Sequence, residues 1–362
     1  MLIGLDASDL STNRADGTTR YTRELVRRLP LLGNDHEWLL FAPADFEIGT
    51  SLPANAHKII SPWPKYWTQA RLPFDLLPRR PDVMWMPIQQ LPILRPRKMK
   101  TVVTVHDLAF HMFGQQYTYK DWILLHAFTA HVAREADRII AVSQSTANDI
   151  ATYYGRTSDV HVIHHGVDLQ TFHIPTESQR QDSWQKLTSA YPKLRRPFVL
   201  YVGQMQPRKN LPALIKAFEI AHGSNRDLQL VISSGHGWKQ AETLEAIKSS
   251  RVAEHIYMPG KVSDELLPAL YWHAAALALV SFYEGFGMPI LEALACGTPV
   301  VTSHVSSMPE VGSGQTILVD PMNVESIAQG LLKVLKAPRS AGLAETYSWD
   351  VTAAQTLRLL VD

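Results

Sequence analysis

Several features that would assign a protein to a special class are missing from this sequence. A single cysteine, Cys296, excludes a disulfide within the chain, and its place on an apolar stretch indicates a core residue. The 35 Lys and Arg residues nearly balance the 34 Asp and Glu residues, so the chain lacks the positive field that nucleic-acid binding favours. No apolar run approaches the roughly 20 residues that a membrane-spanning helix requires. The sequence therefore predicts neither a nucleic-acid-binding protein nor an integral membrane protein.

Signals for export are absent as well. The N-terminal segment MLIGLDAS has no basic stretch followed by an apolar one, so we predict no signal peptide and expect a cytoplasmic protein. Tandem repeats and low-complexity tracts are also missing. At 362 residues the chain is long enough for two domains, each with its own core.

Short apolar runs alternate with longer amphipathic segments along the whole chain. Such alternation is typical of α/β domains in which parallel strands are joined by right-handed helical crossovers. Polar residues dominate around 172–193, which indicates an interdomain linker. We therefore expect an N-terminal domain over 1–170 and a C-terminal domain over 171–347. The strand-like runs include LIGLDAS, HEWLLFAP, AHKIISP, DVMWMP, KTVVTVHDL, PFVLYVG, LQLVISSG, HIYMPG, ALALVS and PVVTS.

The most informative stretch is 282–301, which reads FYEGFGMPILEALACGTPVV. Glu284 and Glu292 stand on either side of a Gly-Phe-Gly turn that leads from a buried strand into a helix. Such a turn gathers backbone N–H groups and the positive end of a helix at one point, which suits a diphosphate. Carboxylates accept hydrogen bonds from hydroxyls, so one glutamate suits a sugar ring and the other a ribose. The alternative interpretation is that Glu284 is a solvated loop residue and Glu292 part of an exposed helix face.

This stretch resembles the E-x7-E signature of the family 4 glycosyltransferases, which are retaining enzymes of GT-B fold. The resemblance implies two Rossmann-like, doubly wound parallel-sheet domains that face a cleft. It also implies that the last helix, within 348–362, crosses back onto the N-terminal domain. In this family the first glutamate contacts donor-sugar hydroxyls and the second contacts the nucleotide ribose, which corresponds to Glu284 and Glu292. The resemblance covers nearly the whole chain and is most specific at 198–211 and 276–301.

A second motif of the same family follows the strand PFVLYVG. A glycine followed six residues later by a lysine holds the donor diphosphate in the family, and Gly203 and Lys209 have this spacing. Gln204 stands where the family usually has an arginine, so we expect Arg208 to supply the missing charge. The form PRKN resembles that of bacterial polysaccharide mannosyltransferases. The donor-binding residues implied by the resemblance are Gly17, Gly203, Arg208, Lys209, Gly285, Phe286, Gly287, Met288 and Glu292.

Two positions in the N-terminal half complete the predicted site. His106 and Asp107 end the strand TVVTVHDL, and ligands of open α/β sheets gather at the carboxyl ends of strands. The resemblance implies that His106 approaches the transferred sugar, whereas a structural histidine is the alternative. Gly17 lies in the first loop, where it could let the backbone approach the donor phosphate or serve only as a turn. The catalytic residues implied are His106, Arg208, Lys209 and Glu284.

The segment 58–100 is unevenly charged. Its basic residues face only Asp75 and Asp82, and tryptophan and tyrosine side chains are interleaved with them. Such a segment could lie on the inner face of the cell membrane or grip a polyprenyl diphosphate acceptor. A solvated surface with the aromatic side chains in the core is the interpretation that we favour. The residues concerned are Lys58, Lys65, Arg71, Arg79, Arg80, Arg95, Arg97, Lys98 and Lys100, with Trp63, Tyr66, Trp67 and Trp85.

The resemblance implies a retaining hexosyltransferase that needs neither a metal nor a cofactor. Mannose from GDP-mannose is the expected donor, and a glycan or polyprenyl-diphosphate-linked molecule of surface polysaccharide or lipopolysaccharide synthesis is the expected acceptor. A rhamnosyl- or glucosyltransferase and a sugar-nucleotide epimerase of the same fold are the alternatives. Histidine pairs such as His106 with His111 are five residues apart, which does not place them on one helix face as a zinc pair requires.

Overall fold

The computed structural model describes residues 1–12, 16–63, 65–235, 237, 239–339, 342 and 347–362. The chain forms two compact units, each with its own sheet. Unit 1 consists of Met1–Gly166 together with Thr346–Asp362, and unit 2 consists of Val167–Glu345. The sequence placed this boundary after residue 170, and the structure places it after Gly166.

Unit 1 contains a seven-stranded sheet in the order β3-β2-β1-β4-β5-β6-β7, with every neighbouring pair parallel. The order reverses at β1, whose neighbours are β2 and β4, so the loops after these strands diverge and leave room for side chains above the sheet. The strands are β1 (Leu2–Asp6), β2 (Glu37–Ala42), β3 (Ala56–Ile60), β4 (Val83–Met86), β5 (Lys100–Val105), β6 (Arg138–Ala141) and β7 (Val160–Val162).

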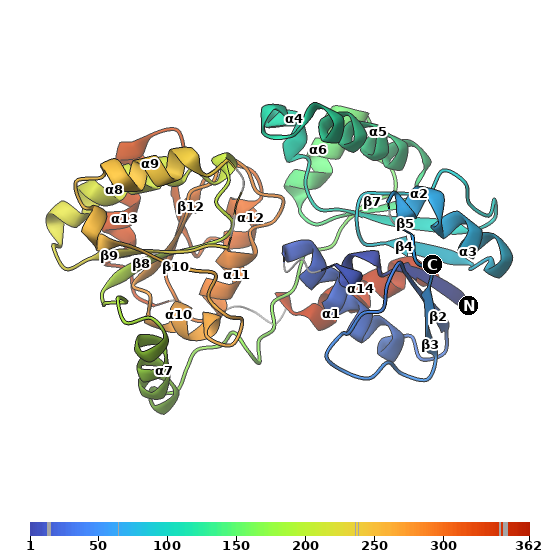
Figure 1. Cartoon of the computed structure of the whole chain (residues 1–362), viewed down its shortest axis with the longest axis horizontal. Helices are drawn as coiled ribbons and strands as arrows, with labels where there is room; N and C mark the ends of the chain where they lie inside the picture. Colours follow the sequence, from blue (N-terminus) through green and yellow to red (C-terminus); the bar gives the residue numbers. More distant parts are fainter. Residues whose placement is uncertain (13–15, 64, 236, 238, 340–341, 343–346) are drawn as a thin grey trace. The chain divides into compact units, whose positions relative to one another are not determined.

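Helices cover both faces of this sheet, with α4, α5 and α6 on one side and α1 and α14 on the other (Figure 1). Local sequence sets several of their ends. Ser143 caps α6 by accepting a hydrogen bond from the backbone N–H of Thr146, and Gly155 ends it with a φ of 69°. The helices are η1 (Ser8–Ser11), α1 (Gly17–Leu32), α2 (Trp67–Ala70), α3 (Leu72–Arg79), α4 (Ala109–Met112), η2 (Gly114–Gln116), α5 (Tyr119–Glu135), α6 (Gln144–Tyr154) and α14 (Trp349–Val361).

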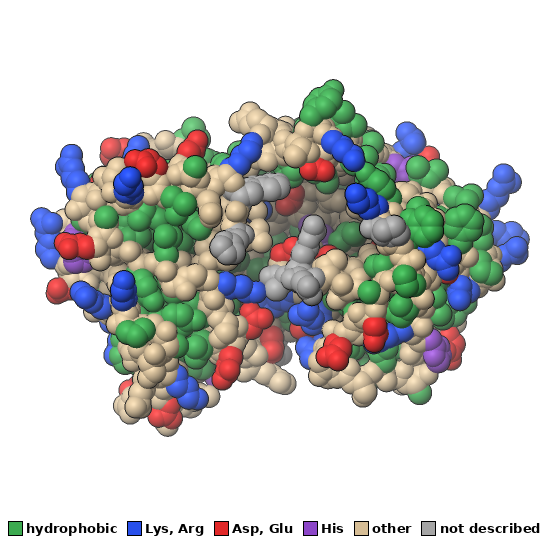
Figure 2. Space-filling model, viewed as in Figure 1, with side chains coloured by type: hydrophobic (Ala, Val, Ile, Leu, Met, Phe, Trp, Pro, Cys, Tyr) green, Lys and Arg blue, Asp and Glu red, His purple; other side chains and the backbone are tan. Residues whose placement is uncertain are grey.

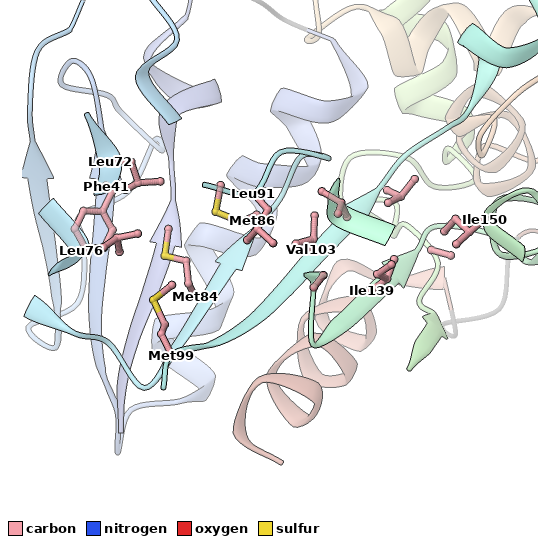
Figure 3. Packing of buried hydrophobic residues seen from close by; sticks show 14 of the residues in the cluster. Phe41, Leu72, Leu76, Met84, Met86, Leu91, Met99, Val103, Ile139 and Ile150 are labelled. Atoms are coloured by element: carbon pink, nitrogen blue, oxygen red, sulfur yellow. The ribbon is translucent and has the colours of Figure 1, made fainter. Parts of the chain in front are cut away.

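One hydrophobic cluster joins the strands of unit 1 to the helices above them. Figure 3 shows Leu72 and Leu76 of α3 directed toward Phe41 of β2 and Met84 of β4. All four side chains are fully buried. The inner side of α3 is therefore fixed in the core, which also fixes the direction of its outer side.

Unit 2 contains a six-stranded parallel sheet in the order β10-β9-β8-β11-β12-β13. In Figure 1, α8, α9 and α13 cover one face of this sheet and α10 and α11 cover the other. Its order reverses at β8, so the loops that follow β8 and β11 meet at one edge of the sheet. The strands are β8 (Phe198–Val202), β9 (Gln229–Ser233), β10 (Ile256–Gly260), β11 (Ala276–Leu279), β12 (Val300–Ser303) and β13 (Ile317–Val319). The helices are α7 (Glu177–Ala190), η3 (Pro207–Lys209), α8 (Leu211–Ser224), α9 (Ala241–Ser249), η4 (Ala253–His255), α10 (Leu267–His273), α11 (Met288–Ala295), α12 (Met308–Gly312) and α13 (Val324–Val334).

The predicted linker at 172–193 is wrong, because most of it is the helix α7. Thr176 and Gln179 form a capping box at its start, in which each side chain bonds the other residue's backbone N–H. The segment reads as polar because only Ser183 and Leu187 of this helix are buried. The polar composition of this segment therefore reflects an exposed helix rather than a segment without secondary structure.

The last helix, α14, returns to unit 1 and packs against α1, as expected for this fold. The Thr352 hydroxyl donates a hydrogen bond of 2.9 Å to the carbonyl of His164, and Arg28 of α1 bonds Asp350 at 2.6 Å. Gly166 lies against the start of this helix. A Cβ atom at position 166 would stand 2.2 Å from the backbone nitrogen of Trp349, so only glycine fits.

We expect Gly166→Ala to lower the melting temperature by at least about 5 °C. The added methyl group meets backbone atoms that cannot rotate away, and a cost of about 2 kcal/mol corresponds to such a shift in a domain of this size. Gly223→Ala is the matched control, because a Cβ at that position in α8 meets nothing within 4 Å. Thermal unfolding followed by circular dichroism measures both variants, and an equal effect of the two substitutions would contradict the close packing of α14.

Candidate active site

The loop between β11 and α11 has the predicted strand, turn and helix arrangement. Gly287 is the N-cap of α11 with a φ of 102°, which explains the glycine at that position, and Pro289 follows in the first turn of the helix. Gly297, just past the helix end, has a φ of 70°. The turn therefore carries Glu284 to the carboxyl edge of the sheet and opens at the N-terminus of a helix.

Glu284 is the centre of a buried ion cluster. Its carboxylate accepts hydrogen bonds from Lys209 Nζ at 2.6 and 2.7 Å and from an Arg208 guanidinium nitrogen at 3.1 Å. The Ser281 hydroxyl donates a further bond of 2.7 Å, and the Glu284 side chain is nearly inaccessible to solvent. Burial alone would raise the pKa of this carboxyl, but the two neighbouring cations outweigh it and lower the pKa to about 2. Glu284 is therefore firmly ionised.

Two serines that the sequence analysis missed hold the backbone at Glu284. The hydroxyls of Ser306 and Ser307, which follow β12, both donate to the carbonyl of Glu284. The backbone N–H of Glu284 in turn donates to the Ser306 hydroxyl at 3.1 Å. The sequence signal was the run HVSSMPE after a strand, a polar cluster at the same edge of the sheet.

The loop after β8 brings the two basic residues to the same place. Gly203 begins it with a φ of 148°, and the short helix η3 then carries Arg208 and Lys209. The Arg208 carbonyl accepts a bond of 2.8 Å from the N–H of Phe282, and the Arg208 guanidinium donates to the carbonyl of Tyr283 at 2.9 Å. The β8 and β11 loops are thus joined by backbone as well as by charge.

Asn210 fixes the position of this loop. The sequence analysis did not identify it as a residue that forms the site. It adopts a left-handed conformation with a φ of 58° at the start of α8. Its buried amide nitrogen donates to the carbonyls of Val280, at 3.1 Å, and Pro321, at 2.7 Å. An asparagine directly after PRK, where the chain must reverse into a helix, was the available signal.

Glu292 is buried on α11 rather than exposed. One of its carboxylate oxygens accepts a hydrogen bond of 2.8 Å from the hydroxyl of Tyr271, a residue of α10. The interpretation of Glu284 and Glu292 as solvated surface residues is therefore wrong, since 5% and 3% of their surfaces remain exposed. Both carboxylates are therefore buried and hydrogen-bonded within unit 2.

His106 follows β5 in unit 1. Its Nε2 atom lies 2.7 Å from the carbonyl oxygen of Pro87, which can only accept, so Nε2 carries the proton and Nδ1 is left as an acceptor. Burial lowers the pKa of His106, which keeps the ring neutral. Nδ1 has no hydrogen-bond partner among the described residues. Asp107 instead accepts from the N–H of Ala109 at the start of α4, a local structural bond.

Gly17 is the first residue of α1 rather than a tight turn. Asp16 caps the helix by accepting from the N–H of Thr19, and Gly17 has no left-handed φ. A Cβ atom built at Gly17 would meet nothing within 4 Å. The protein itself therefore does not require glycine here, and the prediction that a ligand approaches this position stays a prediction.

The structure brings Gly203, Arg208, Lys209 and the loop 284–288 to one edge of the unit 2 sheet, with Glu292 on the following helix. Gly17 and His106 belong to unit 1. In the described part of the chain no three His, Cys, Asp or Glu side chains are grouped so that they could hold a metal ion.

Two family models match the two halves of the chain. The model described as Glycosyltransferase Family 4 matches residues 15–171, and the model described as Glycosyl transferases group 1 matches residues 185–347. The chain belongs to the family 4 glycosyltransferases. Such enzymes use a nucleotide-sugar donor and a glycan acceptor, and the two parallel-sheet units are those of the GT-B fold.

Individual glycosyltransferases are also similar to this chain. The chain is 28% identical over 376 residues to O-antigen chain mannosyltransferase B of Escherichia coli, a match that covers 94% of each protein. It is 30% identical over 273 residues to the serotype-specific mannosyltransferase WbdA of Escherichia coli, covering 70% of this chain and 32% of WbdA. The structure of HepE from Anabaena in complex with UDP-glucose superposes with a TM-score of 0.70, at 16% identity over 99% of both chains.

We expect Glu284→Gln to destabilise this family 4 enzyme at neutral pH, because Lys209 and Arg208 lose the carboxylate that compensates their buried charges. The loss should depend on pH. The folded-state pKa of Glu284, about 2, lies below its usual value of 4.5, so the wild-type advantage is complete above pH 4.5 and declines as the pH falls toward 2. The slope is about 1.4 kcal/mol per pH unit within that window.

Melting temperatures of the wild type and Glu284→Gln between pH 7 and pH 3 give the measurement. Their difference should be largest at pH 5 and above and should narrow at pH 3.5. A difference that stays constant over this range would show that the ion cluster does not lower the pKa of Glu284.

Proposed function

We propose that the chain is a retaining mannosyltransferase that uses GDP-mannose and acts in the synthesis of a surface polysaccharide. The observation that carries this proposal is the cluster of Glu284, Lys209 and Arg208 beside a helix N-terminus, with Glu292 buried on the same helix. The similarity to O-antigen chain mannosyltransferase B along nearly the whole of both chains supports mannose. The acceptor is then a glycan or a polyprenyl-diphosphate-linked saccharide.

The charge of the cluster suits a diphosphate leaving group. Arg208 and Lys209 contribute two positive charges that a diphosphate can bind, and Glu284 contributes one negative charge that holds them in place. The backbone N–H groups of 285–287 add a positive helix end at the same edge. Preorganised donors of this kind are each worth roughly 3 to 4 kcal/mol when charge develops in the transition state.

Glu284 accepts hydrogen bonds from sugar hydroxyls and does not act as a nucleophile. Its carboxylate is bound by two cations and has a pKa near 2, so its electrons are poorly available for attack on a carbon atom. We therefore propose front-face transfer. The bond between the anomeric carbon and the diphosphate oxygen breaks, the acceptor oxygen bonds that carbon from the same side, and the departing phosphate oxygen takes the acceptor's proton.

Two residues of unit 1 contribute to donor binding in this proposal. Neutral His106 offers its Nδ1 atom to a sugar hydroxyl, and Gly17 allows the backbone to approach the phosphates. The sequence contains no Asp-x-Asp pair, and the side chains of Arg208 and Lys209 can take the place of a divalent ion. We therefore propose transfer without a metal.

Glu292→Ala and Glu284→Ala should affect different kinetic constants. Ribose contacts bind the donor and the transition state alike, so Glu292→Ala should weaken nucleotide binding and raise KM. Contacts with the flattening sugar ring strengthen in the transition state, so Glu284→Ala should mainly lower kcat, by at least about tenfold. Calorimetry with the nucleoside diphosphate and steady-state kinetics distinguish the two, and the site assignment is wrong if both variants behave as wild type does.

A donor screen tests the proposed function directly. Thermal shifts with GDP, UDP, dTDP and ADP should single out GDP, because a ligand that binds only the folded state raises the melting temperature. GDP-mannose should then be consumed in the presence of an acceptor, and equally so in EDTA. Preference for UDP or dTDP would indicate a glucosyl- or rhamnosyltransferase. Conversion of the donor without an acceptor would indicate an epimerase, and activity restored only by magnesium or manganese would exclude metal-free transfer.

A further inference from the structure

Unit 1 exposes large apolar side chains on α3, directly before α2 and in the neighbouring loops. We call these six side chains the apolar face. Its members are Trp63, 48% exposed, Tyr66, 51%, Phe74, 63%, Leu77, 37%, Ile93, 69%, and Leu94, 55%. Trp67 and Trp85 do not belong to it, because both are buried in unit 1. The aromatic side chains of this segment are therefore divided between the core and the surface. The favoured interpretation, which places them in the core, is correct for only part of them.

Core packing and hydrogen bonds of unit 1 fix the position of the apolar face. Leu72 and Leu76 anchor the inner side of α3 in the core (Figure 3), so Phe74 and Leu77 are turned outward. Gln69 of α2 connects this helix to the loop that contains Leu91 and Ile93. Its side-chain nitrogen donates to the carbonyl of Leu91 at 2.9 Å, and its oxygen accepts from the N–H of Ile93 at 3.1 Å.

Exposed cations lie close in sequence to these apolar side chains, and Figure 2 shows green hydrophobic and blue basic side chains together over this part of unit 1. Arg71 and Arg79 are partly compensated by the buried carboxylate of Asp75, at 3.2 and 3.7 Å. Four further cations, Lys65, Arg80, Arg97 and Lys98, are exposed and form no ion pair with any described residue. The apolar face is therefore accompanied by exposed positive charge.

We propose that the apolar face docks onto an anionic lipid bilayer. Apolar side chains of this size gain free energy in the acyl boundary, while tryptophan, tyrosine, lysine and arginine are favoured at the headgroup level. Each basic residue near an anionic surface adds an attraction of its own. A second copy of the chain would fit less well, because a symmetric self-contact would bring the same cations together. No helix in the described part of the chain is long and apolar enough to cross a bilayer.

Flotation with vesicles tests this proposal without any sugar substrate, so its result is independent of the proposed transfer reaction. The full chain should float with vesicles of phosphatidylcholine and phosphatidylglycerol. It should bind pure phosphatidylcholine at least about tenfold more weakly, and high salt should release it. Equal binding to both vesicle types, or no binding to either, would overturn the proposal.

Matched variants locate the contact. Arg97→Gln with Lys98→Gln should weaken binding to anionic vesicles at least about tenfold, since each charge contributes about fivefold. Lys193→Gln with Arg195→Gln, a pair of exposed cations on unit 2, should leave binding unchanged. Phe74→Ser with Ile93→Ser should also weaken binding about tenfold or more, whereas Met322→Ser, which alters a residue 79% exposed on unit 2, should not.

Two further measurements separate lipid from protein as the occupant of the apolar face. Brominated lipids should quench tryptophan fluorescence of the wild type more than that of Trp63→Phe. Light scattering should find the lipid-free chain in the same oligomeric state as Phe74→Ser with Ile93→Ser. A dimer that dissociates in that variant would show that a second copy, rather than a bilayer, covers the face.

Discussion

The carboxylate of Glu284 between Lys209 and Arg208 is the interaction on which unit 2 most depends. Removing water from three charges is costly, and the cost is recovered only when each charge keeps its partner at hydrogen-bond distance. The cations and the carboxylate come from different loops, so neither loop can be displaced without leaving a buried charge uncompensated. Asn210 and Ser306 fix the two backbones independently of that charge. The same bonds that stabilise the sheet edge therefore hold Arg208 and Lys209 in fixed positions.

The local part of this arrangement was predictable from the sequence. Glycine and proline act on the residues next to them, so Pro289, Gly287 and Gly297 were sufficient to place α11 and its turns. The parallel sheets followed from the alternation of apolar runs. The hydrogen bonds that secure the site could not be predicted in this way. Ser306 bonds a residue 22 positions away and Tyr271 one that is 21 positions away, and both depend on the order of strands and helices in space.

Amino-acid composition predicts local structure less reliably than the pattern of residues does. Residues 172–193 are polar because α7 is mostly exposed. The capping-box pattern at the start of this helix indicates a helix more reliably than the polar composition indicates a linker. The basic segment 58–100 gives the same lesson. The number of tryptophans does not tell which ring enters the core. Trp67 of α2 is buried, whereas Trp63 in the preceding loop is exposed, although the two are close in sequence.

The position of α14 has a consequence for synthesis on the ribosome. This helix packs on α1 of unit 1, yet 182 residues, 167–348, lie between Gly166 and Trp349, and they include all of unit 2. At 5 to 20 residues per second, roughly 10 to 40 s pass between the emergence of the last strand of unit 1 and that of its final helix. During this interval the surface of α1 that later receives α14 is uncovered in the nascent chain. Unit 2 can complete its own core first, although it is encoded second.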